Sequence, residues 1–420
     1  MTTASPRAVD LGGEQLSGSF DPSRLKQQFP IFQTHPDLVF LDTGASAQKP
    51  ASVIDRIGDY YRTDYANVNR GVYRLSARST ELFEEARVKA QRFLNAADPR
   101  EIVFVRGATE AINLVSQSWG GAFLESGDEV VISELEHHSN IVPWQLLRDR
   151  IGIRIVVTPI DATGGLDLAA LATRLSPRTR LVAVTHIANA TGALVPIETI
   201  VELAHRVGAR VLVDGCQAAP RLPVDVQALG CDFYAFSGHK TYGPTGIGVL
   251  WGRHELLAAM PPWQGGGDMI LNVTFEKTVF QDPPHRFEAG TPDISGAIGL
   301  ATALDFIEGL GRDNILEHEE ALTGYGVDRL SRIAGLNLIG AGQRRLGILS
   351  FDLEGVHPHD LATVLDRHHV AVRAGHHCAQ PLLDKLGLSA TTRASLGVYN
   401  DERDIDALVE GIEAAKEMFR

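Results

Sequence analysis

"VLVDGCQAAPRLPVDVQALGCDFYAFSGHKTYGPTGIGVL", residues 211–250, is the stretch that decides the fold. An apolar, β-branched run ends at Asp214, and a second strand-like run ends just before Lys240. Open α/β sheets place ligands at the carboxyl ends of their strands, so both side chains are expected to face one crevice. An aspartate there can pair with a cationic ring nitrogen, and a lysine can form a Schiff base with an aldehyde.

Pyridoxal phosphate uses this pair of contacts, because the aspartate strengthens the ring as an electron sink. For an isolated aspartate and lysine, a buried ion pair is the alternative. Ser237, His239 and the glycines around Lys240 favour the cofactor. A nucleotide P-loop does not fit, because His239 rather than glycine precedes the lysine and no spaced glycine comes before it.

Strand-like runs surround this block and alternate with helical patterns. The alternation predicts an α/β domain with a largely parallel sheet over residues 37–300. Within it, residues 261–296 are rich in loops and are expected to join domains or to face another subunit. The runs are "LVFLD" (38–42), "EIVFV" (101–105), "EVVIS" (129–133), "RIVVTPI" (154–160), "RLVAVTH" (180–186), "ARVLVD" (209–214) and "DFYAFS" (232–237).

The two ends of the chain differ from this pattern. Residues 301–420 combine long helical patterns with a few strands, which predicts a smaller α+β domain with a last helix over 401–419. Residues 1–20 are rich in glycine and serine and are expected to be mobile. Residues 21–36 are expected to form a helix, capped by an aspartate before proline, that packs near the small domain.

Composition limits the partners. The 420 residues include 39 Lys and Arg against 52 Asp and Glu, a net charge of −13 that is spread along the chain. Nucleic acid and anionic membranes are therefore not expected as partners. The sequence has neither an 18-residue apolar run nor a signal-peptide pattern, so a cytoplasmic location is expected. Three cysteines, Cys216, Cys231 and Cys378, are better interpreted as free thiols than as a disulfide framework.

Two further motifs could serve the same cofactor. In "FVRGATEAINLV" (104–115), Thr109 stands at the mouth of a helix after a strand and a glycine, where exposed N–H groups bind phosphate. Alone, this pattern is more often a simple helix cap. In "EHHSN" (136–140), His137 could stack on a planar ring. Metal binding is the alternative, but the His/Cys group at 376–378 is consecutive and lacks the usual spaced pairs, so no metal site is expected.

Five segments together resemble the SufS-type cysteine desulfurases, in the class V branch of the fold-type I pyridoxal phosphate enzymes. The resemblance runs from "FLDTGASAQKP" (40–50) to the end of the chain. It implies the aspartate-aminotransferase-like α/β fold, with a large cofactor-binding domain, a small C-terminal domain that carries a catalytic cysteine loop, and a homodimer. The segments are "SGHKTYGPTGIGVL" (237–250), "VLVDGCQA" (211–218), "LEHHSNIVPWQ" (135–145), "RFEAGTP" (286–292) and "RAGHHCAQPL" (373–382).

The resemblance implies roles for individual residues around pyridoxal phosphate. Lys240 would carry the internal aldimine, Asp214 would contact the pyridine nitrogen, Gln217 the ring hydroxyl, and His137 would stack on the ring. Polar side chains would hold the phosphate: Thr109, Ser237 and His239, with Thr291 reaching it from the neighbouring subunit.

The substrate would be held through its carboxylate. By the same resemblance Arg393 binds that group, as a bidentate guanidinium can, with Asn189 and Arg373 nearby. The sequence departs from the family at three positions. Cys216 and Gly44 stand where relatives commonly have alanine, and Asn69 replaces a frequent histidine of the pocket wall.

Cys378, in the polar loop "RAGHHCAQPL", is the expected nucleophile. A flexible loop with flanking histidines should favour both the thiolate and its access to substrate. The resemblance then implies that L-cysteine becomes L-alanine while its sulfur remains on Cys378 as a persulfide, for iron–sulfur cluster assembly. A buried structural cysteine is the alternative for this residue. A selenocysteine lyase on the same scaffold, or a non-catalytic scaffold protein, is the alternative for the chain.

His359 of "VHPHD" (356–360) is the expected contact for a sulfur acceptor. The resemblance favours an acceptor of the zinc-containing SufU type, in which a desulfurase histidine replaces a cysteine on the zinc. Neutral imidazole is a suitable zinc ligand. The alternatives are a zinc-free SufE-type acceptor, and a histidine that is simply a polar residue in the first turn of a helix.

Overall fold

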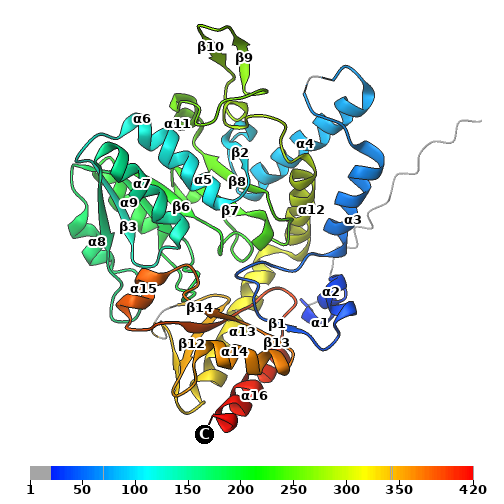
Figure 1. The fold of residues 1–420 in the computed structure, drawn as a ribbon, viewed down its shortest axis with the longest axis vertical. Coiled ribbons are helices and arrows are strands. Elements are labelled where there is room, and N and C mark those ends of the chain that lie inside the picture. Colours follow the sequence, from blue (N-terminus) through cyan, green and yellow to red (C-terminus); the bar gives the residue numbers. More distant parts are fainter. Residues whose placement is uncertain (1–19, 70, 341, 343, 420) are drawn as a thin grey trace, which may run out of the picture.

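The computed structural model describes residues 20–69, 71–340, 342 and 344–419. The segment expected to be mobile, residues 1–20, therefore lies outside the described residues except for its last residue. A large and a small part follow one another along the longest axis (Figure 1).

A seven-stranded sheet forms the centre of the large part, in the order β2-β8-β7-β6-β5-β3-β4. All neighbouring strands are parallel except for β8, which is antiparallel to both β2 and β7. The prediction of a largely parallel sheet is confirmed. The strands are β2 (Ile102–Val105), β3 (Glu129–Ser133), β4 (Arg154–Thr158), β5 (Thr179–Thr185), β6 (Arg210–Asp214), β7 (Phe233–Ser237) and β8 (Gly248–Gly252).

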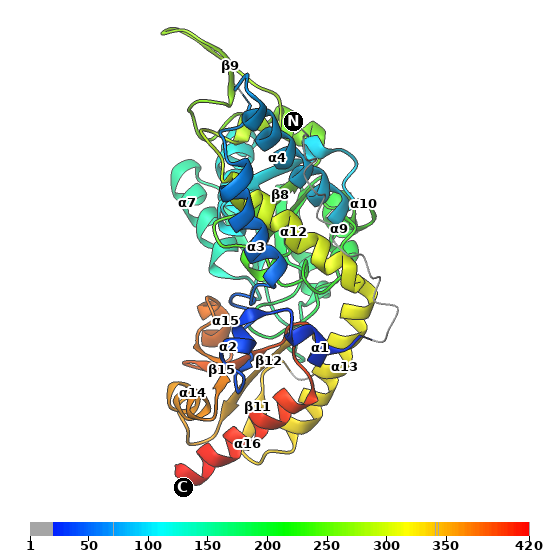
Figure 2. The same cartoon turned by 90° about the vertical axis from the view of Figure 1, so that its right-hand side faces the viewer.

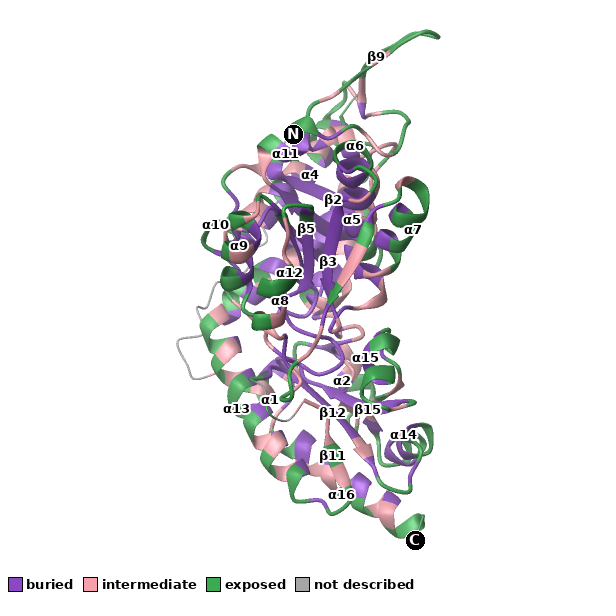
Figure 3. Cartoon of the chain, turned by 90° about the vertical axis from the view of Figure 1, so that its left-hand side faces the viewer, coloured by how far each residue is buried: buried purple, intermediate pink, exposed green. Residues whose placement is uncertain are grey.

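Helices cover both faces of this sheet, which is why its strands are continuous apolar runs rather than alternating ones. Successive side chains of a strand enter two separate core clusters: Val211 and Val213 join one, and Leu212 the other. Figure 3 shows the central strands buried beneath exposed helix faces. The first cluster contains residues of α4 (Arg74–Phe93), α9 (Ile197–Arg206) and α12 (Ile294–Leu310), and the second those of α5 (Ala108–Leu114) and α7 (Val142–Ile151).

The small part contains a four-stranded antiparallel sheet in the order β11-β12-β15-β14. Helices α13, α14 and α16 flank it (Figure 2), and the predicted last helix is confirmed as α16. The elements are α13 (Arg312–Ser331), β11 (Leu336–Leu338), β12 (Ile348–Leu353), α14 (Pro358–Arg367), β14 (Arg373–Gly375), α15 (Gln380–Lys385), β15 (Thr391–Ser395) and α16 (Glu402–Met418).

Two details of the predicted division along the chain are wrong. The run "LVFLD" does not join the large sheet, because β1 (Val39–Phe40) pairs in parallel with β13 (Val370–Ala371) of the small part. A two-residue strand is too short for its hydrophobic pattern to indicate which strand it pairs with. The boundary at residues 300/301 falls inside α12, which continues to Leu310 and bends by 75° into α13. A division at Gly311 therefore follows the backbone better.

Residues 21–36 form two short helices rather than one: α1 (Pro22–Lys26), capped by Asp21, and α2 (Pro30–Thr34). The break follows from Pro30, because the residue before a proline avoids the helical region, and Phe29 is extended. Lys26 pairs with Asp404 of α16 at 2.7 Å, as expected for packing near the small part. Phe29 also packs edge-on against Tyr242 of the large part.

The loop-rich stretch 261–296 contains a hairpin of β9 (Ile270–Val273) and β10 (Thr278–Phe280) that projects from the large part (Figures 1 and 2). Apolar side chains on it are exposed, including Leu271 and Phe275. In the described part of the chain, no helix is by itself long and apolar enough to cross a membrane. The bent pair α12 and α13 passes that test only together, by length and composition.

A buried ion pair joins the two parts. Nε of Arg221, in the loop after β6, lies 2.8 Å from Oε2 of Glu319 in α13, and both side chains are 1% exposed. Nη2 of Arg221 donates a hydrogen bond of 2.9 Å to the carbonyl oxygen of Leu396, which follows β15. Burial raises the pKa of Glu319 to about 7, and Arg221 opposes this rise.

Glu319→Ala is expected to lower the free energy of unfolding by about 3–5 kcal/mol, because it leaves the charge of Arg221 buried without a partner. The control is Glu320→Ala, one residue further along α13, which removes a solvent-exposed partner of Arg344. The Glu320→Ala substitution should lower the free energy of unfolding by less than about 1 kcal/mol. Urea unfolding of both variants measures the difference, and equal midpoints would show that the buried pair does not stabilise the junction.

Candidate active site

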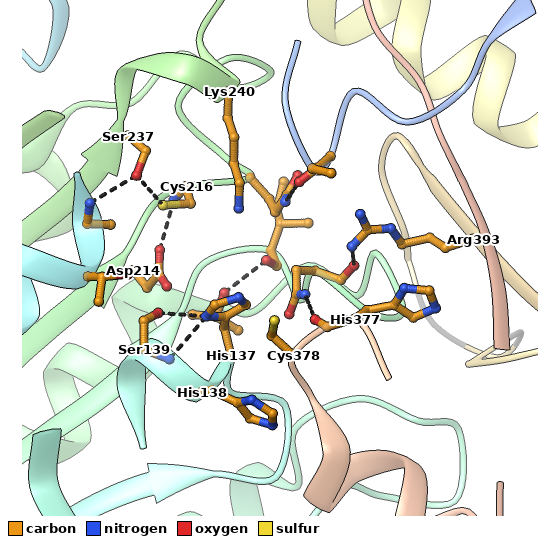
Figure 4. A pocket seen from close by; sticks show the side chains of 18 of the residues that line it. His137, His138, Ser139, Asp214, Cys216, Ser237, Lys240, His377, Cys378 and Arg393 are labelled. Atoms are coloured by element: carbon orange, nitrogen blue, oxygen red, sulfur yellow. Dashed lines mark hydrogen bonds between the residues drawn. The ribbon is translucent and has the colours of Figure 1, made fainter. Parts of the chain in front are cut away.

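A cavity of about 580 Å³ lies where the carboxyl ends of the central strands face the small part (Figure 4). It brings together residues that lie far apart in the sequence, from both parts of the molecule. Eleven of the thirteen predicted site residues line it: Thr109, His137, Asn189, Asp214, Gln217, Ser237, His239, Lys240, Arg373, Cys378 and Arg393.

Asp214 and Lys240 reach the cavity from neighbouring strands. The register of β6 pairs Asp214 with Thr185 of β5 and with Ala235 of β7. The aspartate is 4% exposed, and its Oδ1 accepts a hydrogen bond of 3.0 Å from the N–H of Cys216. Lys240 ends the short turn that follows β7. The strand-end placement predicted for both residues is confirmed.

The start of α5 meets the end of β7 at the side of the cavity where a phosphate was expected. The N–H of Ala108 donates a hydrogen bond of 2.9 Å to Oγ of Ser237. Gly107 has a φ of 155°, and a Cβ atom there would lie 3.1 Å from the same Oγ, so glycine is required. Burial, together with Lys240, lowers the pKa of His239 to about 4, so this ring is neutral near pH 7.

His137 presents a neutral ring to the cavity. Its Nδ1 accepts a hydrogen bond of 3.1 Å from the N–H of Ser139, and burial and Lys240 lower the pKa of the ring to about 4. A neutral imidazole is suited to stacking on a pyridine ring.

Glu136, beside His137, is a residue whose importance the sequence analysis missed. It accepts hydrogen bonds from Asn140 Nδ2 (2.7 Å) and from the N–H of Thr185 (3.1 Å), and burial raises its pKa to about 8. Glu136 holds the loop that carries His137 against β5.

Two arginines line the side of the cavity that was expected to bind a carboxylate, and Asp42 pairs with both of them. Arg393, in β15, is 2% exposed, and its Nη1 donates a hydrogen bond of 2.9 Å to the carbonyl oxygen of Asn189. Burial lowers the pKa of Arg393 to about 10, so it remains cationic at neutral pH. Arg373 donates to both carboxylate oxygens of Asp42, at 3.0 and 2.7 Å. No role for Asp42 follows from the sequence pattern.

Cys378 is exposed, whereas Cys216 and Cys231 are buried. Burial raises the pKa of the Cys216 thiol to about 12 and raises that of Cys231 as well, so neither is a ready nucleophile. The interpretation of Cys378 as a buried structural cysteine is contradicted.

One expectation about the cysteine loop is wrong. His377 does not provide a polar, protonatable neighbour for the thiol, because it is buried with its Nε2 at 2.8 Å from Oγ1 of Thr391. Burial and the charge of Arg393 lower the pKa of His377 to about 3. The neutral ring is part of the loop's packing.

Three other residues lie away from the cavity within this chain. Thr291 lines a second cavity of about 460 Å³, so its predicted contact with the phosphate of a neighbouring subunit stays a prediction. Asn69 is exposed with a left-handed φ of 73°, and it is not part of the cavity wall as the sequence analysis expected. His359 lies in the first turn of α14, with its ring stacked on His357 at 5.4 Å.

The cavity suits pyridoxal phosphate by its chemistry and its size. It contains a primary amine, a buried carboxylate, hydroxyl and amide groups and a neutral imidazole. Buried polar atoms of its wall, among them Oδ1 of Asn189 and Nε of Arg393, have no hydrogen-bond partner within the described residues. A bound polar ligand would satisfy them.

Comparison with solved structures gives the same architecture. The cysteine desulfurase CsdA of Escherichia coli, in an S-sulfonic acid form, has a TM-score of 0.89 and 40% identity, covering 96% of this chain and all of that one. The apo cysteine desulfurase of Thermococcus onnurineus has a TM-score of 0.90 and 36% identity, covering 94% of this chain and 98% of the other.

Sequence comparison places the chain in a family. The model of the aminotransferase class-V family matches residues 39–408. The cysteine desulfurase of Dickeya dadantii is 50% identical over 93% of this chain and 95% of its own length. The chain spans 66% of the cysteine desulfurase of Synechococcus elongatus, which is also 50% identical, and so covers only part of some relatives. The chain therefore belongs to the aminotransferase class-V family and, within it, to the pyridoxal-phosphate-dependent cysteine desulfurases.

Proposed function

We propose that this chain converts L-cysteine to L-alanine and keeps the sulfur on Cys378 as a persulfide, which supplies iron–sulfur cluster assembly as in the SufS-type enzymes. One observation carries the proposal: the exposed thiol of Cys378 shares a cavity with the amine of Lys240 and the carboxylate of Asp214. These three groups are what the reaction needs, and they come from both parts of the fold.

When bound, pyridoxal phosphate supplies an electron sink that acidifies the Cα–H bond of an amino acid. Lys240 is the residue that would hold it, and its Nζ then moves the proton from the substrate Cα. Asp214 would keep the ring nitrogen protonated, and His137 would orient the ring by stacking. Contacts to the ring hydroxyl would come from Gln217, and contacts to the phosphate from Thr109, Ser237 and His239.

The sulfur transfer itself needs no oxidant. The guanidinium of Arg393 would hold the substrate carboxylate, which places the side-chain sulfur toward Cys378. The Cys378 thiolate attacks that sulfur, an S–S bond forms, and the C–S bond of the substrate breaks. The electron pair of that bond stays with the three-carbon fragment, which takes up a proton and leaves as alanine. Thiolate plus cysteine thus gives persulfide plus alanine, with all atoms balanced.

Two features support a homodimer as part of this proposal. Thr291 can contribute to a phosphate site only from a second copy, because within its own chain it lines a different cavity. The projecting hairpin exposes Leu271 and Phe275, apolar side chains that a second copy would cover.

The proposed acceptor of the persulfide is a zinc protein of the SufU type, with a SufE-type protein as the rival. Support comes from the imidazole of His359, which is exposed at the start of α14. The N–H of His359 lies 3.3 Å from Nδ1 of His357, and the two rings stack. This contact orients the first turn of the helix and leaves the ring nitrogens of His359 to a partner's metal.

Cys378→Ala is expected to bind cofactor and substrate normally but to lose alanine turnover by at least about a hundred-fold, because the sulfur has no acceptor. Mass spectrometry after incubation with L-cysteine should find the persulfide on Cys378 of the wild type and on no cysteine of the variant. Cys231→Ala, a buried core position, is the control and should keep turnover. A persulfide on Cys216 or Cys231 would move the nucleophile elsewhere.

Arg393→Ala is expected to raise KM for L-cysteine roughly ten- to a hundred-fold while the resting absorption spectrum stays unchanged, because a charge-assisted, bidentate contact is lost. Arg393→Lys should recover only part of the loss, since a lysine lacks the planar fork. Arg367→Ala, on the exposed face of α14, serves as the control. An unchanged KM in Arg393→Ala would assign the substrate carboxylate to another residue.

His359→Ala is expected to keep the basal rate and to lose stimulation by a zinc-loaded SufU-type protein, because the exchanged zinc ligand is missing. Steady-state alanine production with and without that protein measures the effect. His368→Ala, an exposed histidine just past α14, should be stimulated like the wild type. Equal stimulation of wild type and His359→Ala would rule out the ligand exchange.

A further inference from the structure

His138, a residue of the large part, makes two hydrogen bonds with the loop that carries Cys378. The N–H of His138 donates a hydrogen bond of 2.8 Å to the carbonyl oxygen of Cys378. The N–H of Gln380 donates a second one, of 3.1 Å, to Nε2 of the His138 ring. Figure 4 shows His138 next to Cys378, on the side away from Lys240. Both contacts lie on the C-terminal side of the nucleophile, one at its own carbonyl group and one two residues further along the chain.

This loop needs such an attachment because its backbone is strained. His377 and Cys378 have left-handed φ angles of 53° and 54°, a conformation that costs about 1 kcal/mol or more for each residue other than glycine. The third contact at the turn is the hydrogen bond of 2.6 Å from Nδ2 of Asn189 to the carbonyl oxygen of His377. The turn points the thiol into the cavity. Without these contacts the strained backbone would relax and the thiol would move out of the cavity.

Helix α15 begins directly after this turn and lacks a cap of its own. Its N-cap residue is Ala379, which has no side-chain acceptor. Pro381 has no N–H, and the N–H of Leu382 donates to the carbonyl oxygen of Ala379. It is therefore the N–H of Gln380 that needs a partner from elsewhere. The ring of His138 provides that partner. A histidine of the large part therefore caps a helix of the small part.

The ring can accept this hydrogen bond only in its neutral form, with the proton on Nδ1. Partial burial and the nearby His376 lower the pKa of His138, which keeps the ring neutral. Its neighbour His137 is neutral as well, so no charge in the pair competes with the contact.

We propose that His138 is a positioning residue that clamps the Cys378 loop and holds the thiol in place over the substrate sulfur. The inference rests on the proposed role of Cys378 as the persulfide-forming nucleophile. In this role His138 acts through the backbone at Cys378 and at Gln380, rather than through a contact with cofactor or substrate.

Two substitutions distinguish the contribution of the acceptor atom Nε2 from that of the aromatic ring. His138→Phe keeps an aromatic ring but removes Nε2, whereas His138→Gln loses the ring but keeps an acceptor oxygen. Loss of one neutral hydrogen bond corresponds to about a five-fold change in an equilibrium. His138→Phe is therefore expected to slow single-turnover persulfide formation by about five-fold and to speed alkylation of Cys378 by iodoacetamide by a similar factor.

His138→Gln should restore both rates toward those of the wild type, and His35→Ala, an exposed histidine far along the chain, should change neither. Mass spectrometry of the alkylated and persulfidated peptides assigns both reactions to Cys378. Unchanged rates in His138→Phe, or a His138→Gln variant that behaves like His138→Phe, would overturn the clamp. A wild-type persulfide on another cysteine would instead contradict the proposed nucleophile, and the alkylation rates would still decide whether His138 holds the loop.

Discussion

The lateral pairing of β5, β6 and β7 is the constraint on which the rest of the structure depends. Because β6 lies between two parallel neighbours, its register fixes Asp214 beside Thr185 on one side and Ala235 on the other. Glu136 accepts a hydrogen bond from the N–H of Thr185, so the loop with His137 takes its position from the same sheet edge. A shift of one residue in this register would turn Asp214 to the opposite face of the sheet.

The second constraint is that residues of both the large and the small part line the cavity. The large sheet provides the groups expected to hold the cofactor, while the cysteine loop and Arg393 belong to the small sheet. Arg221 ties the two together, since it contacts Glu319 and the backbone after β15 and also donates a hydrogen bond of 3.1 Å to Oε1 of Gln217. The geometry of the site therefore depends on how the two sheets dock, and not on either sheet alone.

Burial sets the charges of the cavity. It lowers the pKa values of His137 and His239 to about 4, so both rings stay neutral throughout the physiological range. Arg393 remains cationic despite its burial. Behind the cavity wall, burial also moves the pKa values of Glu136 and Lys49 toward neutrality, each to about 8. Lys49 donates a hydrogen bond of 3.0 Å to the carbonyl oxygen of His239, so its titration acts on the backbone of the segment that carries Lys240.

The sequence alone determined the α/β class, the strand-end positions of Asp214 and Lys240, and the separate character of Cys378, because these follow from local runs and from residue types beside them. Only the tertiary structure decided which sheet takes the strand at residues 38–42, that Asp42 neutralises Arg373, and that the histidine beside Cys378 is buried. These features depend on contacts between segments hundreds of residues apart. The sequence pattern of a short strand, of a carboxylate or of a histidine in a polar loop does not depend on which residues it contacts in the fold. The docking of the two sheets determines those contacts.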